Sequence, residues 1–270
     1  MSSWQALRGE LDAWQAAGRR CHFWWRDDDA VEPTPALARL LASAKAYRVP
    51  LALAVVPLPA HDSLAEALDD AVTTPVQHGL AHVNHAAADA KSAELGPARP
   101  LARNVSDLAR GWQRMQELFG ARAFPLLVPP WNRIDPALIP YLTGLGFRGL
   151  STYGVRTRAL AASGLMQVNT HLDIIDWRGG GNFVGEKKAL GQLVSHLSAR
   201  RTGEADADEP SGLLTHHLAH DDAAWRFIDE LLALSSGHRA VRWLAVREIV
   251  GPAGAEMAAS AHDGSAAGGS

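Results

Sequence analysis

Short apolar runs alternate with amphipathic stretches along most of this chain. The apolar runs have the length of buried β-strands and lie at residues 23–25, 51–56, 75–77, 124–128, 147–151, 167–170, 213–215 and 241–244. Helical patterns fill most of the intervals, at residues 35–47, 63–71, 104–119, 135–144, 186–200 and 222–234. Strands that alternate with helices predict a mainly parallel sheet, and seven or eight strands suit one closed α/β barrel better than two domains.

The two ends of the chain differ from this pattern. Residues 1–20 read as an amphipathic helix, with Trp4, Leu7, Leu11 and Trp14 on one face. Residues 251–270 are rich in Ala, Gly and Ser, which predicts a disordered tail. We therefore expect a single barrel domain over residues 1–250.

Composition narrows the class of partner. The 270 residues carry a formal net charge of -3, and no cluster of Lys and Arg resembles a nucleic-acid footprint. No run of 18 apolar residues predicts a membrane span. The first 20 residues lack the pattern of a signal peptide, and Cys21 is the one cysteine, so we expect a cytoplasmic protein. Composition leaves the oligomeric state open.

Three consecutive aspartates, Asp27, Asp28 and Asp29, end the first predicted strand. Adjacent carboxylates repel one another, and burying any of them costs several kcal/mol unless a cation compensates. The carboxyl ends of parallel strands are where α/β folds build their sites. The expected compensating cation is a metal ion.

Other predicted strands also end in polar residues that could complete a site. His78 follows one strand, and it lies four residues before His82, a spacing that puts both imidazoles on one side of a helical turn. Two histidines and one aspartate would hold a divalent ion and leave positions open for water and substrate. His216 and His217 end a later strand, and either could act as a general acid held by a carboxylate such as Asp176.

Taken in order, these pieces resemble the five motifs of the NodB-homology polysaccharide deacetylases, carbohydrate esterase family four. The resemblance covers roughly residues 22–217 and rests on five short segments, namely Asp27-Asp28-Asp29, His78-Gly79-Leu80-Ala81-His82, Val128-Pro129-Pro130-Trp131, Asp173-Ile174-Ile175-Asp176-Trp177 and Leu214-Thr215-His216. It implies a distorted (β/α)7 barrel, which agrees with the strand count.

The resemblance also implies roles for individual residues. The triple aspartate permits two registers, and we favour Asp28 as catalytic base with Asp29 as metal ligand, because small Ala30 then stands where the family has Gly. The implied metal ligands are Asp29, His78 and His82, the implied acid is His216 assisted by Asp176, and the implied substrate-binding residues are Pro130, Trp131, Arg133 and Trp177. The backbone N–H of Trp131 would help to hold the oxyanion.

Two departures from the family pattern matter. Gly79 replaces a Ser or Thr, and Val128 replaces the arginine that pairs with the base. Arg26 or Arg133 could supply that charge.

The function implied is metal-dependent removal of an acetyl group from an N-acetylated or O-acetylated carbohydrate or glycoconjugate, with zinc as the expected ion. Hydrolysis of another small amide or formamide is one alternative. A catalytically inactive carbohydrate-binding relative is another.

Overall fold

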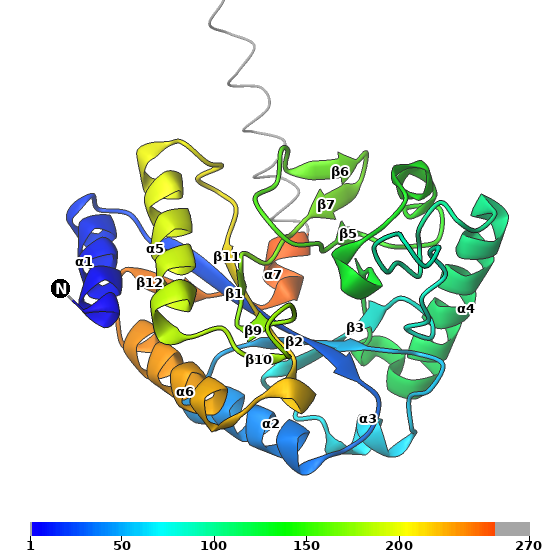
Figure 1. Ribbon diagram of the computed structural model, residues 1–270, viewed down its shortest axis with the longest axis horizontal. Helices are drawn as coiled ribbons and strands as arrows, with labels where there is room; N and C mark the ends of the chain where they lie inside the picture. The colour runs from blue at the N-terminus through cyan, green and yellow to red at the C-terminus, as the bar shows by residue number, and fades with distance from the viewer. Residues whose placement is uncertain (1, 252–270) are drawn as a thin grey trace, which may run out of the picture.

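A strongly curled, mostly parallel sheet forms the centre of the molecule, and helices pack around its outside (Figure 1). The computed structural model describes residues 2–251. The main strands are β1 (Cys21–Ala30), β2 (Leu51–Val55), β3 (Thr73–His78), β4 (Phe124–Val128), β5 (Gly149–Leu150), β7 (Leu165–Gln167), β8 (Leu172–Asp173), β11 (Ser211–Thr215) and β12 (Val241–Trp243). The helices are α1 (Ser3–Ala16), α2 (Pro35–Tyr47), α3 (Ser63–Ala67), α4 (Leu101–Phe119), α5 (Glu186–Thr202), α6 (Asp222–Ser236) and α7 (Val246–Val250).

The curled sheet is closed by residues 165–174. The strand order is β6-β7-β5-β4-β3-β2-β1-β11-β8, where β6 (Leu160–Ala162) is antiparallel to β7. The stretch 165–174 pairs in parallel with β5 through β7 and then with β11 through β8. Backbone hydrogen bonds continue between these two ladders, from Thr170 N–H to Thr152 O and from His171 N–H to Gly212 O. The predicted strand at 167–170 is thus the element that joins the two edges, and the predicted class, a distorted α/β barrel, is confirmed.

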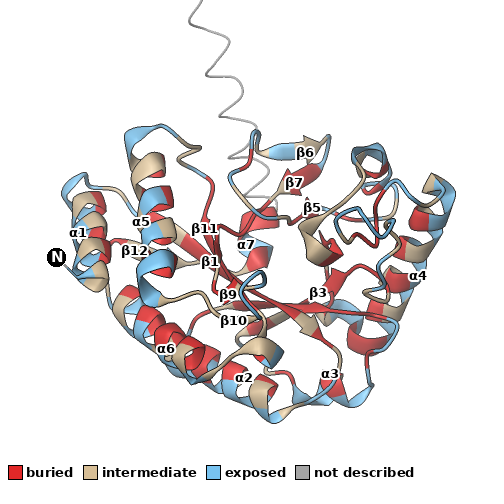
Figure 2. Ribbon diagram, viewed as in Figure 1, coloured by how far each residue is buried: buried red, intermediate tan, exposed pale blue. Residues whose placement is uncertain are grey.

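The three aromatic residues of strand β1, Phe23, Trp24 and Trp25, pack on both faces of the sheet. Side chains alternate along a strand. Trp24 therefore packs in the interior with Val76, Leu126 and Val168, while Phe23 and Trp25 pack outward among the helices. The short helix α7 adds Val246, Ile249 and Val250 to the interior cluster. Figure 2 shows the buried residues concentrated on the strands and on the inward faces of the helices.

Several predicted helix boundaries differ from the observed ones. Helix α2 begins as expected, with Thr34 Oγ1 accepting a hydrogen bond from Leu37 N–H. Helix α3 ends at Ala67 instead of residue 71, and the predicted helix at 135–144 is a 3₁₀ segment, Pro136–Tyr141, with Pro140 inside it. Helix α4 starts at Leu101 instead of residue 104, so Asn104 lies inside the helix and is buried.

Two further expectations concern the ends of the chain and membranes. The predicted tail at 251–270 lies, apart from Gly251, outside the described residues. Within residues 2–251, no helix combines the length and the apolar character that crossing a membrane requires.

The closure of the barrel yields the first prediction. A Cβ on Gly212 would lie 2.5 Å from Trp24 Nε1 on β1, and 2.6 Å from Asn169 O and 2.7 Å from Thr170 Cα in the closing stretch. Gly212→Ala is therefore expected to lower the free energy of unfolding by about 2 kcal/mol, as overpacked cores do. Chemical denaturation measures the change.

Gly191 is the matched control, because it is exposed in helix α5 and a Cβ added there would meet nothing within 4 Å. Gly191→Ala should raise the stability by about 0.5–1 kcal/mol. Equal stability of the Gly212→Ala variant and the wild type would contradict the closure described above.

Candidate active site

The polar strand ends predicted from sequence converge at one mouth of the barrel. Asp28 and Asp29 lie at the carboxyl end of β1, His78 at that of β3, and His216 directly after β11. Since these strands are parallel, their carboxyl ends face the same side. The mouth is therefore the candidate site.

Asp29, His78 and His82 form a compact group at this mouth. The Nε2 atoms of His78 and His82 lie 3.1 and 3.3 Å from Asp29 Oδ1, and the three ligand atoms all lie within 4.8 Å of one another. His78 Nδ1 lies 3.0 Å from the carbonyl oxygen of Val128. A carbonyl accepts only, so Nδ1 carries a proton and Nε2 is the nitrogen that faces Asp29, the arrangement typical of a metal-binding histidine.

The backbone of this group is held in unusual conformations. Asp29 has φ 72° and His82 has φ 55°, values that non-glycine residues rarely adopt. Gly79 has φ 56°, and a Cβ there would lie 2.0 Å from Glu94 Oε2 and 2.6 Å from Pro130. The glycine that replaces Ser or Thr in the motif is thus required by the close approach of Glu94.

Glu94 is a residue of the site that the sequence analysis missed. It is buried, and its carboxylate accepts hydrogen bonds from the N–H groups of Leu80 and Ala81 at 3.0 and 2.8 Å. It thereby fixes the turn that carries His78 and His82. The stretch around Glu94 reads as a polar loop, and nothing in its pattern marks one carboxylate as buried.

Electrostatics within the group favour an ionised Asp29. Burial opposes ionisation, but the hydrogen bond and charge of His78, with the charges of His216 and His82, outweigh it and hold the pKa of Asp29 well below its ordinary value. Burial and the neighbouring His78 lower the pKa of His82, which favours its neutral form. An ionised carboxylate and a neutral imidazole are the forms that bind a metal ion.

Asp28 is paired with an arginine from its own strand. Arg26 Nε and Nη2 donate to Asp28 Oδ1 and Oδ2 at 2.8 and 2.9 Å. Arg133, the other arginine considered for this charge, donates instead to the carbonyl oxygen of Ser92 at 2.7 Å. The charge missing at Val128 is therefore supplied by Arg26.

The two histidines after β11 have different surroundings. His216 Nε2 lies 3.9 Å from Asp28 Oδ2, and its ring meets Trp177 edge-on with 4.7 Å between ring centroids. His217 Nδ1 lies 2.5 Å from Asp27 Oδ1 in a fully buried pair, and Asp27 Oδ2 also accepts from Thr215 Oγ1 and His217 N–H. The geometry thus places His216 at the mouth and His217 behind it.

The carboxylate beside His216 is Asp173. Burial raises the pKa of Asp173, an effect that the charge of His216 opposes, and Trp177 Nε1 donates to Asp173 Oδ2 at 3.0 Å. Asp176, predicted to assist the acid, accepts from the N–H of Gly179 and caps a turn. Asp173 is therefore better placed for that role, and Asp176 as a catalytic residue stays a prediction.

The loop after β4 forms another wall of the mouth. Trp131 and Asn132 both have φ 56°, and the Trp131 ring lies 4.3 Å from the His82 ring, centroid to centroid. Pro130 is buried beneath it, against the Gly79 turn. The sequence thus brings Pro130, Trp131 and Trp177 to the site, with Trp177 53 % exposed.

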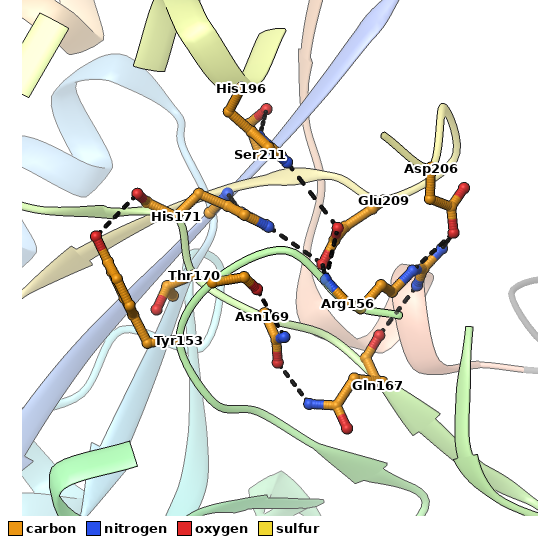
Figure 3. Close-up of polar contacts among 12 residues, drawn as sticks. Tyr153, Arg156, Gln167, Asn169, Thr170, His171, His196, Asp206, Glu209 and Ser211 are labelled. Carbon is orange, nitrogen blue, oxygen red and sulfur yellow. Dashed lines mark hydrogen bonds and ion pairs between the residues drawn. The ribbon is translucent and has the colours of Figure 1, made fainter. Parts of the chain in front are cut away.

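His171, His196 and Glu209 form a second, fully buried group whose ligand atoms also lie within 4.8 Å of one another (Figure 3). These residue types and distances make it a candidate divalent-metal site that sequence reasoning missed. The segment 202–211 reads as an acidic surface loop, yet Glu209 within it is fully buried and accepts from the backbone N–H of Arg156. The group lies near the amino end of β11, away from the mouth.

The orientation of the rings separates this second group from the first. The rings of His171 and His196 are stacked, with centroids 3.6 Å apart and planes 14° from parallel. Because a metal lies in the plane of each imidazole that binds it, two nearly parallel rings do not converge on one ion. His171 Nδ1 also accepts the N–H of Gly212, which leaves the proton on the Nε2 that faces Glu209. Asp29, His78 and His82 therefore fit an ion better.

Comparison with known proteins identifies the fold. Neither a protein-family model nor a curated protein sequence matches this chain. Among solved structures, a protein assigned as a polysaccharide deacetylase from Mycobacterium smegmatis aligns with a TM-score of 0.60 at 16% identity, covering 91% of this chain and 92% of that one. The peptidoglycan deacetylase PdaC from Bacillus subtilis gives 0.53 at 15% identity, covering 90% and 94%.

A third structure, the family 4 carbohydrate esterase from Streptomyces lividans in complex with acetate, gives a TM-score of 0.50 at 17% identity, covering 80% of this chain and 90% of that one. The resemblance read from the sequence is thus matched by similarity in structure over nearly the whole chain. This chain has the fold of the NodB-type polysaccharide deacetylases.

The two candidate metal groups can be told apart by metal content. Wild-type protein is expected to hold about one divalent ion per chain, and His78→Ala/His82→Ala to lose it, because the double variant removes two imidazoles of the mouth. Elemental mass spectrometry measures the ion, and circular dichroism checks that the variant is folded. His171→Gln is the control and should retain the ion. Loss of the ion in His171→Gln alone would move the metal site to the buried group.

Substitutions of the adjacent residues His216 and His217 should affect different properties of the protein. His217→Asn leaves the buried carboxylate of Asp27 without its cationic partner, so the free energy of unfolding should fall by about 3–5 kcal/mol. His216→Asn should leave the free energy of unfolding within about 1 kcal/mol of wild type. Because His216 is the predicted general acid, the change should also lower the rate of acetate release by about 10²–10⁴-fold. Chemical denaturation and turnover are measured on both variants. The reverse pattern would assign the acid to His217.

Proposed function

Starting from the shared deacetylase fold, we propose that this protein is a metal-dependent hydrolase that removes an acetyl group from an N-acetylated or O-acetylated carbohydrate. The observation that carries the proposal is the joint placement, at one mouth, of the Asp29–His78–His82 group, the carboxylate of Asp28 and the imidazole of His216. These are the parts that hydrolysis of an acetyl group requires, namely ligands for a Lewis acid, a base and an acid.

Asp29, His78 and His82 would hold the metal ion, which when bound supplies polarisation of the acyl carbonyl and a more acidic water. The Nδ1–H of His78, directed at Val128 O, keeps its Nε2 aimed at the group. Two imidazoles and one carboxylate suit zinc, the metal we propose, although cobalt, nickel, manganese and iron accept the same ligands.

Asp28 is the proposed base. Its carboxylate is buried next to Asp29 and fixed by Arg26, and so it can accept the proton of the attacking water. The left-handed turn at Trp131 and Asn132 would present the Trp131 N–H to the oxygen on which negative charge develops.

His216 is the proposed acid. Its Nε2 lies 3.9 Å from Asp28 Oδ2, so acid and base flank the same space. Proton transfer from His216 to the departing nitrogen or oxygen of the sugar would complete cleavage. Trp177 packs edge-on against the imidazole and donates a hydrogen bond to Asp173.

The substrate class follows from the walls of the mouth. Trp131 and the half-exposed Trp177 offer aromatic faces of the kind that pack against sugar rings. A cavity of about 440 Å³ adjoins this region and is lined in part by Asn132, Arg133, Thr152 and Tyr153. The polar groups in its lining would suit further hydroxyls of an oligosaccharide or glycoconjugate.

Replacement of the base tests the proposal. Asp28→Asn is expected to lower acetate release from acetylated chito-oligosaccharides by about 10³-fold, because the amide cannot take the water's proton. Acetate is measured by a coupled assay, and metal content and circular dichroism should stay at wild-type values.

Asp208→Asn serves as control, because Asp208 lies on the loop before β11, away from the mouth, and it should retain full activity. Unchanged acetate release by Asp28→Asn would contradict the assignment of Asp28 as the base. Release of formate or ammonia from other amides, with no acetate from any carbohydrate, would favour the alternative amidohydrolase.

A further inference from the structure

Arg26 and Asp28 lie two residues apart on β1. Residues at this spacing project from the same face of a strand, and Trp24 before them packs in the barrel interior. Arg26 is 0 % exposed and Asp28 2 % exposed. Arg26 and Asp28 therefore both project from β1 into the barrel interior, near the mouth.

The contact between the two is a bidentate ion pair. Nε and Nη2 of Arg26 donate to the two oxygens of Asp28 at 2.8 and 2.9 Å. Because the guanidinium and the carboxylate are both planar, two parallel hydrogen bonds fix the plane of the carboxylate as well as its position.

The guanidinium is itself held from the opposite side of the barrel. Nη1 of Arg26 donates to Ser151 Oγ at 2.6 Å, directly after β5, and Nη2 donates to Asn132 Oδ1 at 2.7 Å, after β4. Arg26 therefore crosses the interior from β1 to the ends of β4 and β5. Rotation of the guanidinium would break contacts on both sides.

Asn132 connects this pair to another part of the site. It is adjacent to Trp131 in the turn where both residues have φ 56°. The orientation of Asp28 and the position of the Trp131 turn are thereby set by one side chain.

We propose that Arg26 is a positioning residue, which holds the Asp28 carboxylate in one orientation beside the Asp29–His78–His82 group and keeps it from becoming a fourth ligand of an ion bound there. The catalytic consequence rests on the proposed function, whereas the pairing and the exclusion from the ion do not.

Thermal unfolding of metal-free protein tests the pairing. Arg26→Met should lower the unfolding midpoint by several degrees, because it leaves a buried carboxylate without a partner. Asp28→Asn added to Arg26→Met should restore most of that loss, because the uncompensated charge is gone. Arg156→Met is the matched control. Arg156 is also buried but pairs with Asp206, so Asp28→Asn should restore nothing in that background.

Visible absorption of protein loaded with Co²⁺ tests the exclusion of Asp28 from the ion. Wild type and Asp28→Asn should give the same ligand-field bands, because Asp28 is not a ligand in either. Arg26→Met should shift the bands as the freed carboxylate reaches the ion, and Arg26→Met/Asp28→Asn should return them to those of wild type.

Kinetics test the effect on the reaction. Arg26→Met should lower kcat for acetate release by about 10²-fold with KM within about threefold, because Arg26 is fully buried and has no surface to offer a substrate. Arg26→Lys keeps the positive charge but loses the paired N–H groups of the guanidinium, so its kcat should lie between those of wild type and Arg26→Met. If Arg26→Met fails to fold, Arg26→Gln, which also removes the charge, replaces it in all three experiments.

The absence of thermal coupling between positions 26 and 28, or a Co²⁺ spectrum unchanged in Arg26→Met, would overturn the proposal. Wild-type kcat in a folded Arg26→Met variant would overturn it as well. Coupling and a shifted spectrum in a protein that releases no acetate would support Arg26 as the positioning residue while rejecting the proposed function.

Discussion

Compensation of three consecutive carboxylates is the constraint on which the rest of the structure depends. The end of β1 carries Asp27, Asp28 and Asp29, and each has a different cationic or potentially cationic partner. Asp27 turns outward to His217, Asp28 turns inward to Arg26, and Asp29 reaches His78 and His82. The alternation of the strand, followed by the positive φ of Asp29, sends the three charges in three directions and prevents their mutual repulsion.

This division explains why the site needs elements from around the whole barrel. The partner of Asp27 comes from the turn after β11, and that of Asp29 from β3 and its following turn. The supports of Arg26 come from just after β4 and β5. A parallel barrel brings those ends to one mouth. The closing stretch at 165–174 then places Asp173 and Trp177 next to His216.

The sequence predicted the barrel class and the set of strand ends, because both follow from local periodicity and from where polar residues interrupt it. The sequence offered two candidate partners for Asp28, Arg26 and Arg133. The structure shows Arg26 in this role, because Arg26 and Asp28 project from the same face of β1. Glu94 and Glu209 could not be found in this way. Each lies in a polar loop and is buried only through contacts made across the fold, with the Gly79 turn in one case and with Arg156 and His171 in the other. The length of α3 and the 3₁₀ form of Pro136–Tyr141 likewise depend on packing and on Pro140.

The closing stretch affects where the sheet of the barrel opens locally. Between β5 and β7 the ladder pairs only Gly149 with Met166 and Leu150 with Gln167, whereas β1 and β11 pair over five positions. Because it has fewer ladder bonds than β1 and β11 share, this seam should open at a lower free energy than that pair, and its amides should exchange faster. Asp29 and His78 lie at the ends of β1 and β3, which pair with β2 over longer ladders, so opening of the seam would widen the mouth at Tyr153 and Asp173 and leave these two side chains in register.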